Sequence, residues 1–167
     1  MPAKDMNIEA RFYPIGDIEN FIYYRPSVDV CLEGPKEGAT LGDTIEIPEG
    51  FTIIDIGIRD ITTQEFKLLK IPNSVHKIEY RAFLNVTIES IILGKGIHEL
   101  NRYAFENCNI ERVYYAGNEE DWDRISKEEN NGLDGVKVYF YSIRDPEEND
   151  KYWHYDDNNN PLVWVEE

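Results

Sequence analysis

Apolar residues in the stretch 71–117 recur with a period of 22 positions. Each period opens with an apolar-x-x-apolar-x-apolar pattern, continues with two apolar residues three positions apart, and then has the dipeptide Ala-Phe. A fixed period of this length predicts a stacked-repeat solenoid, because leucine-rich repeats span about 20–29 residues. A shift by 22 positions superimposes Ile71 on Leu93, Val75 on Ile97, Ile78 on Leu100, Ala82-Phe83 on Ala104-Phe105, Asn85 on Asn107, Ile88 on Ile110 and Ile91 on Val113.

The pattern within one period predicts the path of the chain. The opening segment, residues 88–93 in one copy, is typical of the strand that lines the concave face of a leucine-rich repeat. The following apolar pair, residues 75–78 in the other copy, predicts a segment that returns the chain on the opposite side. We expect Asn85 and Asn107 to be buried amides that satisfy unpaired backbone groups at a corner.

Stacking of the repeats predicts one shared core. A single unit cannot bury its own apolar edge, so each unit must pack on its neighbours. We therefore expect Phe83 to lie over Phe105, and residues 88–93 and 110–115 to form adjacent parallel strands.

The extent of the repeat pattern sets the predicted domain boundaries. Residues 43–48 resemble the strand that precedes each Ile-Pro dipeptide. Residues 50–70 are interpreted as a degenerate repeat, with Asp60-Ile61 in place of Ala-Phe. We predict an N-terminal cap over 1–42, about three repeat turns over 43–117 and a C-terminal cap over 118–167. The predicted fold class is a mostly β repeat solenoid, a short leucine-rich repeat with parallel concave strands, a β cap at its N-terminus and a helix and β-hairpin cap at its C-terminus.

The two caps have their own local signals. In the N-terminal cap, the alternation of Val28, Val30 and Leu32 with polar residues predicts a half-buried strand over 27–33. The aromatic residues of 11–25 suit core packing under the cap, with a ligand patch as the alternative.

In the C-terminal cap, Asn118 is a predicted helix N-cap, followed by acidic residues that suit the first turn. Trp122 and Ile125 would share one face and lie over the last repeat. Further on, the sequence predicts a strand at 136–141 and hairpin arms at 152–155 and 162–165.

The charge balance excludes two classes of partner. The chain has 33 acidic and 17 basic residues and a net charge of −16, so nucleic acid and anionic membrane surfaces are unsuitable partners. The acidity lies in the end segments, because the repeat block 71–117 is neutral. The N-terminus shows no apolar signal segment and no stretch has the length of a membrane span, so the chain reads as cytoplasmic.

The outward positions of the concave strands are the predicted binding surface. They stack in three columns: Asp43, Lys67, Glu89, Glu111; Thr44, Leu68, Ser90, Arg112; and Glu46, Lys70, Ile92, Tyr114. We expect Leu68, Ile92 and Tyr114 to be exposed apolar residues beside charges, a mixture that marks interaction surfaces. The alternative is an ordinary strand surface. The predicted partner-binding residues are Lys67, Leu68, Lys70, Glu89, Ser90, Ile92, Glu111, Arg112 and Tyr114.

No motif for catalysis or cofactor binding is present, so we predict a protein that is not an enzyme and that uses no cofactor or metal. His76 and His98 stack as a pair, but a zinc site needs three or four ligands. Cys108 takes the place of Val86 and is expected to be a core thiol. Cys31 has no assignment from the sequence.

Several motifs together resemble the BspA-like leucine-rich repeat proteins of bacteria. The motifs are IPNSV, the paired RAF and YAF, YYAG-x-x-x-x-W, and YWHY followed by VW. The resemblance implies a binding scaffold, secreted or at a cell surface, that adheres to host proteins or other cells. The predicted function is therefore a non-enzymatic protein–protein interaction module. The alternative is a carbohydrate-binding protein or a cytoplasmic adaptor that uses the aromatic C-terminal hairpin, with Trp153, Tyr155 and Trp164.

Overall fold

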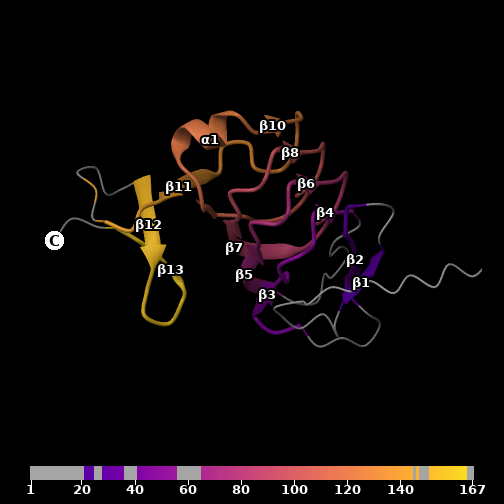
Figure 1. Cartoon of the computed structure of the whole chain (residues 1–167), viewed down its shortest axis with the longest axis horizontal. Helices are drawn as coiled ribbons and strands as arrows, with labels where there is room; N and C mark the ends of the chain where they lie inside the picture. The colour runs from indigo at the N-terminus through magenta and orange to yellow at the C-terminus, as the bar shows by residue number, and fades with distance from the viewer. Residues whose placement is uncertain are drawn as a thin grey trace, which may run out of the picture.

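The chain forms a mostly β solenoid with little helix, as the repeat pattern predicted, and it has about four turns where the sequence suggested about three. The computed structural model describes residues 21–24, 28–35, 41–55, 65–144, 146 and 151–164. Two sheets run along the solenoid, and successive turns add one strand to each (Figure 1). The predicted Asp60-Ile61 position and most of the aromatic segment 11–25 lie outside the described residues.

The longer strands form a seven-stranded sheet, here called the long-strand sheet. Its members in spatial order are β13 (Pro161–Val163), β12 (Tyr152–Tyr155), β11 (Lys137–Tyr141), β9 (Arg112–Tyr115), β7 (Thr87–Leu93), β5 (Glu65–Ile71) and β3 (Thr44–Glu46). β7 and β9 are parallel neighbours, with Ile91 opposite Val113, so the predicted pairing is confirmed. Successive side chains point to opposite faces of these strands, but burial does not alternate: in β7 the residues from Ser90 to Leu93 are all buried, so both faces of the strand are covered there.

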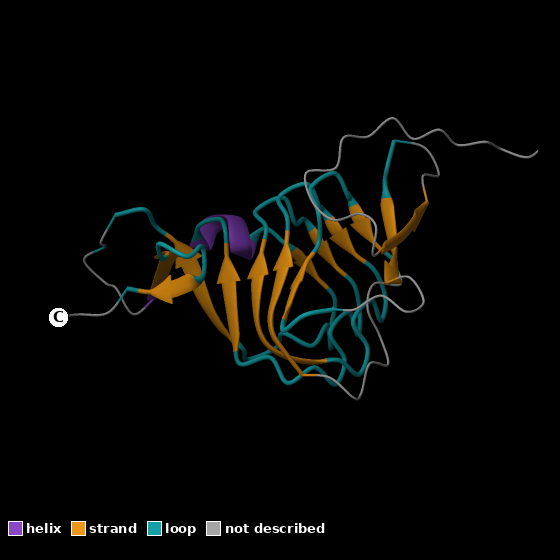
Figure 2. Ribbon diagram, turned by 90° about the horizontal axis from the view of Figure 1, so that it is seen from below, coloured by secondary structure: helices purple, strands orange, loops and turns teal. Residues whose placement is uncertain are grey.

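The return segments form a second, six-stranded sheet of short strands on the opposite side (Figure 2). Its members are β1 (Phe21–Tyr24), β2 (Cys31–Pro35), β4 (Ile53–Ile54), β6 (Lys77–Ile78), β8 (Glu99–Leu100) and β10 (Ser126–Lys127). From β2 to β10 the pairings are parallel, and only β1 runs antiparallel to its neighbour β2. The sheets continue into both proposed caps, and the domain boundaries at 42 and 117 stay a prediction.

One continuous core fills the space between the two sheets. Phe83 lies directly over Phe105, with ring centroids 5.1 Å apart and planes within 2° of parallel. Both side chains are buried, as are Ile88 and Ile110. The shared core of stacked turns is therefore confirmed. It makes each turn depend on its neighbours for burial, as in other solenoids.

The corner asparagines have a different role from the one expected. Asn85 and Asn107 are not buried, and their backbones lie in the left-handed region with φ near 57° and 59°. The Asn107 amide donates to the Asn85 side-chain oxygen at 2.8 Å across adjacent turns. The prediction of buried amides was wrong, because asparagine is used here for its tolerance of positive φ.

The strand in the N-terminal segment also differs from the prediction. β2 starts at Cys31, and Val28 is 78% exposed, while Val30, Cys31 and Leu32 are all buried. The expected half-buried strand over 27–33 was therefore wrong at Val28, which is exposed, and at Cys31, which is buried; β2 lies inside the short-strand sheet, between β1 and β4.

The first element after the repeats follows its local signals. Helix α1 (Glu119–Asp123) begins after Asn118, whose side chain accepts from the Asp121 backbone N–H at 2.8 Å. Ile125 is buried, and Trp122 packs its ring against Tyr115 at 5.3 Å. The helix therefore covers the end of the last repeat, as predicted.

The C-terminal hairpin of β12 and β13 folds back over the outer face of the long-strand sheet. β12 pairs with β11, and strands β9 and β7 lie between β11 and β5 in the sheet. The loop after β12 nevertheless reaches β5, because the Lys70 ammonium lies 3.5 Å from the carbonyl oxygen of Asn159. The hairpin therefore crosses part of the face that the sequence assigned to a partner.

Candidate interaction surface

The three predicted columns are present on the outer face of the long-strand sheet. Leu68 is opposite both Thr44 and Ser90, and Ser90 is opposite Arg112. The third column has the same order, from Glu46 through Lys70 and Ile92 to Tyr114. Sequence periodicity therefore predicted the register of this face correctly.

The exposure of the apolar members was predicted wrongly. Leu68, Ile92 and Tyr114 are only 6%, 4% and 5% exposed, and they form a second apolar cluster together with Tyr139 and Trp153. Ser90 is buried as well, and its hydroxyl donates to the Lys67 carbonyl at 2.9 Å. These outward-facing side chains are covered because the hairpin supplies an apolar layer above them.

Trp153 is the anchor of this cover. Its side chain is 0% exposed, its ring lies 5.6 Å from that of Tyr114 and 5.2 Å from that of Tyr141. Its indole N–H donates to the Tyr115 carbonyl at 2.9 Å, so the polar atom of the buried ring is satisfied. The sequence showed that this hairpin is rich in aromatic residues, but it did not indicate which surface the Trp153 ring would cover.

The other half of the face is open. A groove of about 360 Å³ lies along the first column, at the N-terminal ends of the long strands. Lys67, Glu89 and Glu111 are exposed there, and Arg112 is half-buried beside them. The groove is lined by Asp43, Glu65, Phe66, Lys67, Thr87, Glu89, Asn109 and Glu111.

Ion pairs leave this groove with an acidic character. The Lys67 ammonium lies 3.0 Å from Asp43, and the Arg112 guanidinium lies 3.5 Å from Glu111 and 3.9 Å from Glu89. The lining has four carboxylates and one ammonium, so its net charge is negative. The groove can therefore attract a positively charged group from a partner.

Arg112 stands at the border between the open and covered halves. Its contact with the Tyr114 hydroxyl raises the pKa of the guanidinium, which stays charged. Burial under the hairpin raises the pKa of Tyr114, so the phenol stays neutral. The two groups form a fixed polar edge to the apolar cluster.

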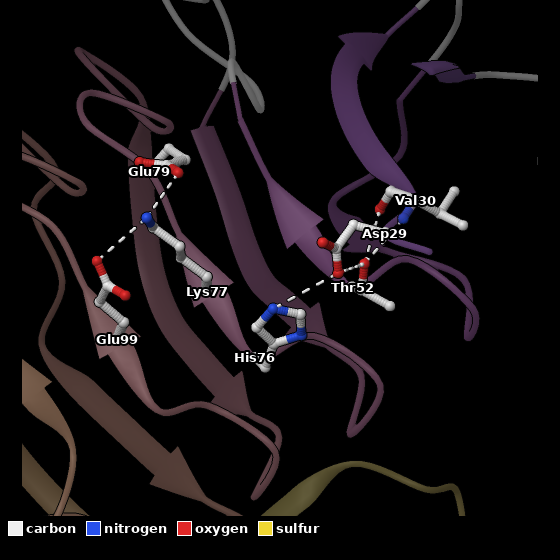
Figure 3. A network of polar contacts seen from close by, with 7 residues as sticks. All are labelled: Asp29, Val30, Thr52, His76, Lys77, Glu79 and Glu99. Carbon is white, nitrogen blue, oxygen red and sulfur yellow. Dashed lines mark hydrogen bonds and ion pairs between the residues drawn. The ribbon is translucent and has the colours of Figure 1, made fainter. Parts of the chain in front are cut away.

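Polar contacts also join successive turns on the short-strand side (Figure 3). The Thr52 hydroxyl donates to Asp29 at 3.1 Å and accepts from the Val30 backbone N–H at 2.8 Å, and His76 Nε2 lies 3.7 Å from Asp29. Lys77 lies between Glu79 and Glu99, and these contacts, first of all the hydrogen bond with Glu79, raise its pKa. This network holds turns together.

The histidines and cysteines have structural positions. His76 and His98 are linked through their backbones, since the His98 N–H donates to the His76 carbonyl. Within the described ranges, no group of three or more His, Cys, Asp or Glu side chains is placed to hold a metal ion. The Cys108 thiol donates to the Phe83 carbonyl at 2.7 Å, and burial raises its pKa to about 11. Cys31 is buried, and no disulfide joins it to Cys108.

No helix in the described part of the chain is long and apolar enough to span a membrane.

Comparison with known proteins identifies the repeat block. Residues 61–128 match the family described as BspA type Leucine rich repeat region (6 copies). Searches of curated proteins and of solved structures gave no match. Repeats of this family are generally interaction modules and not enzymes. The fold, the 22-residue register and the family match agree with the sequence motifs, so residues 61–128 are a repeat region similar to the BspA-type leucine-rich repeat family.

Proposed function

We propose that the chain is a non-enzymatic module that binds a partner protein in the acidic groove of the long-strand sheet. The observation that carries this proposal is the division of the outer face. The hairpin covers Leu68, Ile92 and Tyr114, whereas the groove around Glu89 and Glu111 is open.

The charges of the groove define the kind of partner. Lys67 is held by Asp43, and the remaining carboxylates of Glu65, Glu89 and Glu111 outnumber Arg112. A partner would place Lys or Arg side chains here, and binding would weaken as salt increases because exposed charges are screened.

The family resemblance suggests the specific setting of this binding. Adhesion to a surface protein of a host or another cell is the role we propose for the groove. Capture of a cytosolic protein by the same groove would make the chain an adaptor instead, and the experiment below separates the two.

The test uses charge reversal at exposed positions. Immobilised chain is incubated with extracts of surface-biotinylated cells and, separately, with their cytosol. We expect the wild type to retain biotinylated proteins and the variant Glu89→Lys/Glu111→Lys to lose them. Ile92 and Tyr114 are unsuitable for this purpose because they are buried.

The matched control is Glu129→Lys/Asp134→Lys. It makes the same change in net charge at exposed positions of the loop before β11. This control should retain the biotinylated proteins. Equal retention by the groove variant, or equal loss by the control, would contradict the groove assignment. Retention of cytosolic proteins alone, abolished by the groove variant, would favour the adaptor.

A further inference from the structure

A second cavity lies where the hairpin loop meets the C-terminal ends of the long strands. It has a volume of about 240 Å³ and is separate from the acidic groove. Strands β3 and β5 supply one wall with Glu46 and Lys70, and the hairpin supplies the other with Tyr155 and Asn159. Ile92 and Ala116 give it apolar surface. The cavity therefore exists only because the hairpin folds over the sheet.

Lys70 provides a hydrogen-bond donor with spare capacity. Its side chain is only 19% exposed, yet the ammonium has long contacts, 3.7 Å to Glu46 and 3.5 Å to the Asn159 carbonyl. A charge-assisted hydrogen bond is normally about 2.7–2.9 Å long. Among the described residues this nitrogen makes no shorter polar contact, so it can donate to a ligand in the cavity.

The acceptors and the aromatic wall are held in place. Glu49 accepts the backbone N–H groups of Asn73 and Ser74 at 3.3 and 3.2 Å, which fixes the turn after β5. Asp156 accepts the backbone N–H groups of Asn158 and Asn160 at 2.9 and 2.7 Å, which orders the hairpin loop.

Tyr155 is the aromatic group of the cavity. One side of it is packed, with its ring 4.9 Å from that of Trp153, and the residue is 39% exposed. Burial first, then the electrostatic effects of the nearby Tyr141 and Glu46, raise the pKa of its hydroxyl, which is therefore a neutral donor and acceptor near Glu46.

The mixture of groups selects a class of ligand. An anion would meet the carboxylates of Glu46 and Glu49, and a metal cation would meet the ammonium of Lys70. A neutral polyol satisfies both, because each hydroxyl donates to a carboxylate and accepts from an ammonium. The volume lies below the ~300–1,000 Å³ of usual small-molecule pockets, which favours a single ring over an oligomer.

We propose that this cavity binds one neutral sugar residue, with its hydroxyls on Glu46 and Lys70 and its ring against Tyr155 and Ile92. This site is independent of the protein-binding groove.

The experiment titrates the ¹⁵N-labelled full chain with the methyl glycosides of glucose, galactose, mannose and N-acetylglucosamine, followed by amide chemical shifts. We expect at least one glycoside to give saturable shifts at Lys70, Tyr155 and Asn159. Lys70→Met should weaken that binding about tenfold or more, because it removes a charged hydrogen bond to the ligand. The matched control Lys67→Met, on the acidic groove, should bind as the wild type does.

Two results would overturn the proposal. One is the absence of saturable shifts at the cavity residues with all of these glycosides. The other is unchanged affinity in Lys70→Met. If the amide spectrum shows that Lys70→Met disturbs the fold, Glu46→Gln decides, since Glu46 is exposed and its replacement should weaken binding while the spectrum stays native.

Discussion

At the scale of single residues, the corners of the solenoid depend on backbone conformation. Asn85 and Asn107 occupy equivalent corners with positive φ and are joined by one amide hydrogen bond. Arg81 and Tyr103 also occupy equivalent positions with positive φ, one turn apart. The repeat thus uses left-handed residues twice per turn, and glycine is not required at either place.

Replacement of Asn107 by a β-branched residue should expose this requirement. Asn107→Val should lower the free energy of unfolding by about 1–2 kcal/mol more than Asn107→Gly, because the left-handed conformation penalises Cβ. Urea denaturation measures the difference. The matched pair Asn109→Val and Asn109→Gly, at a position without positive φ, should show no such penalty for valine. A similar valine penalty at both positions would contradict the assignment.

The Cys108 thiol gives a pH-dependent prediction. Its pKa rises from 9.0 to about 11 in the fold, chiefly through burial. The neutral thiol is favoured in the folded state, so its contribution to stability is present below pH 9 and is lost as pH rises toward 11.

Alkylation reports on the raised pKa together with the burial of the thiol. At pH 9, iodoacetamide should modify Cys108 much more slowly in the folded chain than in urea, as followed by peptide mass spectrometry. Similar rates in the two states would show that the thiol is neither buried nor raised in pKa in the fold.

At the scale of elements, the C-terminal hairpin acts as a cover for the long-strand sheet. Its backbone pairing to β11 is short, limited to Phe140 with Tyr152 and Tyr141 with Trp153. Its attachment therefore depends strongly on the apolar cluster beneath Trp153. The hairpin also supplies half of the proposed sugar cavity.

Truncation of the anchor should release the hairpin. Trp153→Ala should cost about 3–5 kcal/mol and leave Leu68, Ile92 and Tyr114 uncovered. Hydrogen exchange should show lost protection in β12 and β13, while β5 and β7 stay protected. Trp164→Ala is the matched control, because Trp164 is stacked on His154 outside the cluster and should have a smaller effect. Unchanged protection of β12 in Trp153→Ala would contradict the role of the anchor.

At the scale of the whole molecule, the periodicity of the sequence predicted the repeated strands but not the position of the C-terminal hairpin, which occurs only once. The register of β5, β7 and β9 follows from apolar positions that recur at a fixed spacing. The position of Trp153 could not be derived in this way, because the hairpin is not a repeat. The aromatic residues of the hairpin were compatible with a terminal cap or a ligand surface, and only the structure places the hairpin over β7 and β9.

This difference explains which parts of the candidate site could be predicted. The predicted columns have the correct neighbours on adjacent strands, so the charged residues Lys67, Glu89 and Glu111 lie where we expected them. The exposure of a side chain depends on the whole fold. Leu68 and Ile92 are buried by the C-terminal hairpin, which lies about 60 to 85 residues later in the chain.

The chain divides the outer face of its long-strand sheet into an open acidic groove and a covered apolar half. The most direct test is a nuclear Overhauser experiment on the wild-type chain in solution. We expect cross-peaks between the Trp153 indole and the ring of Tyr114, whose centroids are 5.6 Å apart, and between the indole and the methyl groups of Ile92. A Trp153 indole without these cross-peaks, and with rapid N–H exchange, would contradict this division of the face.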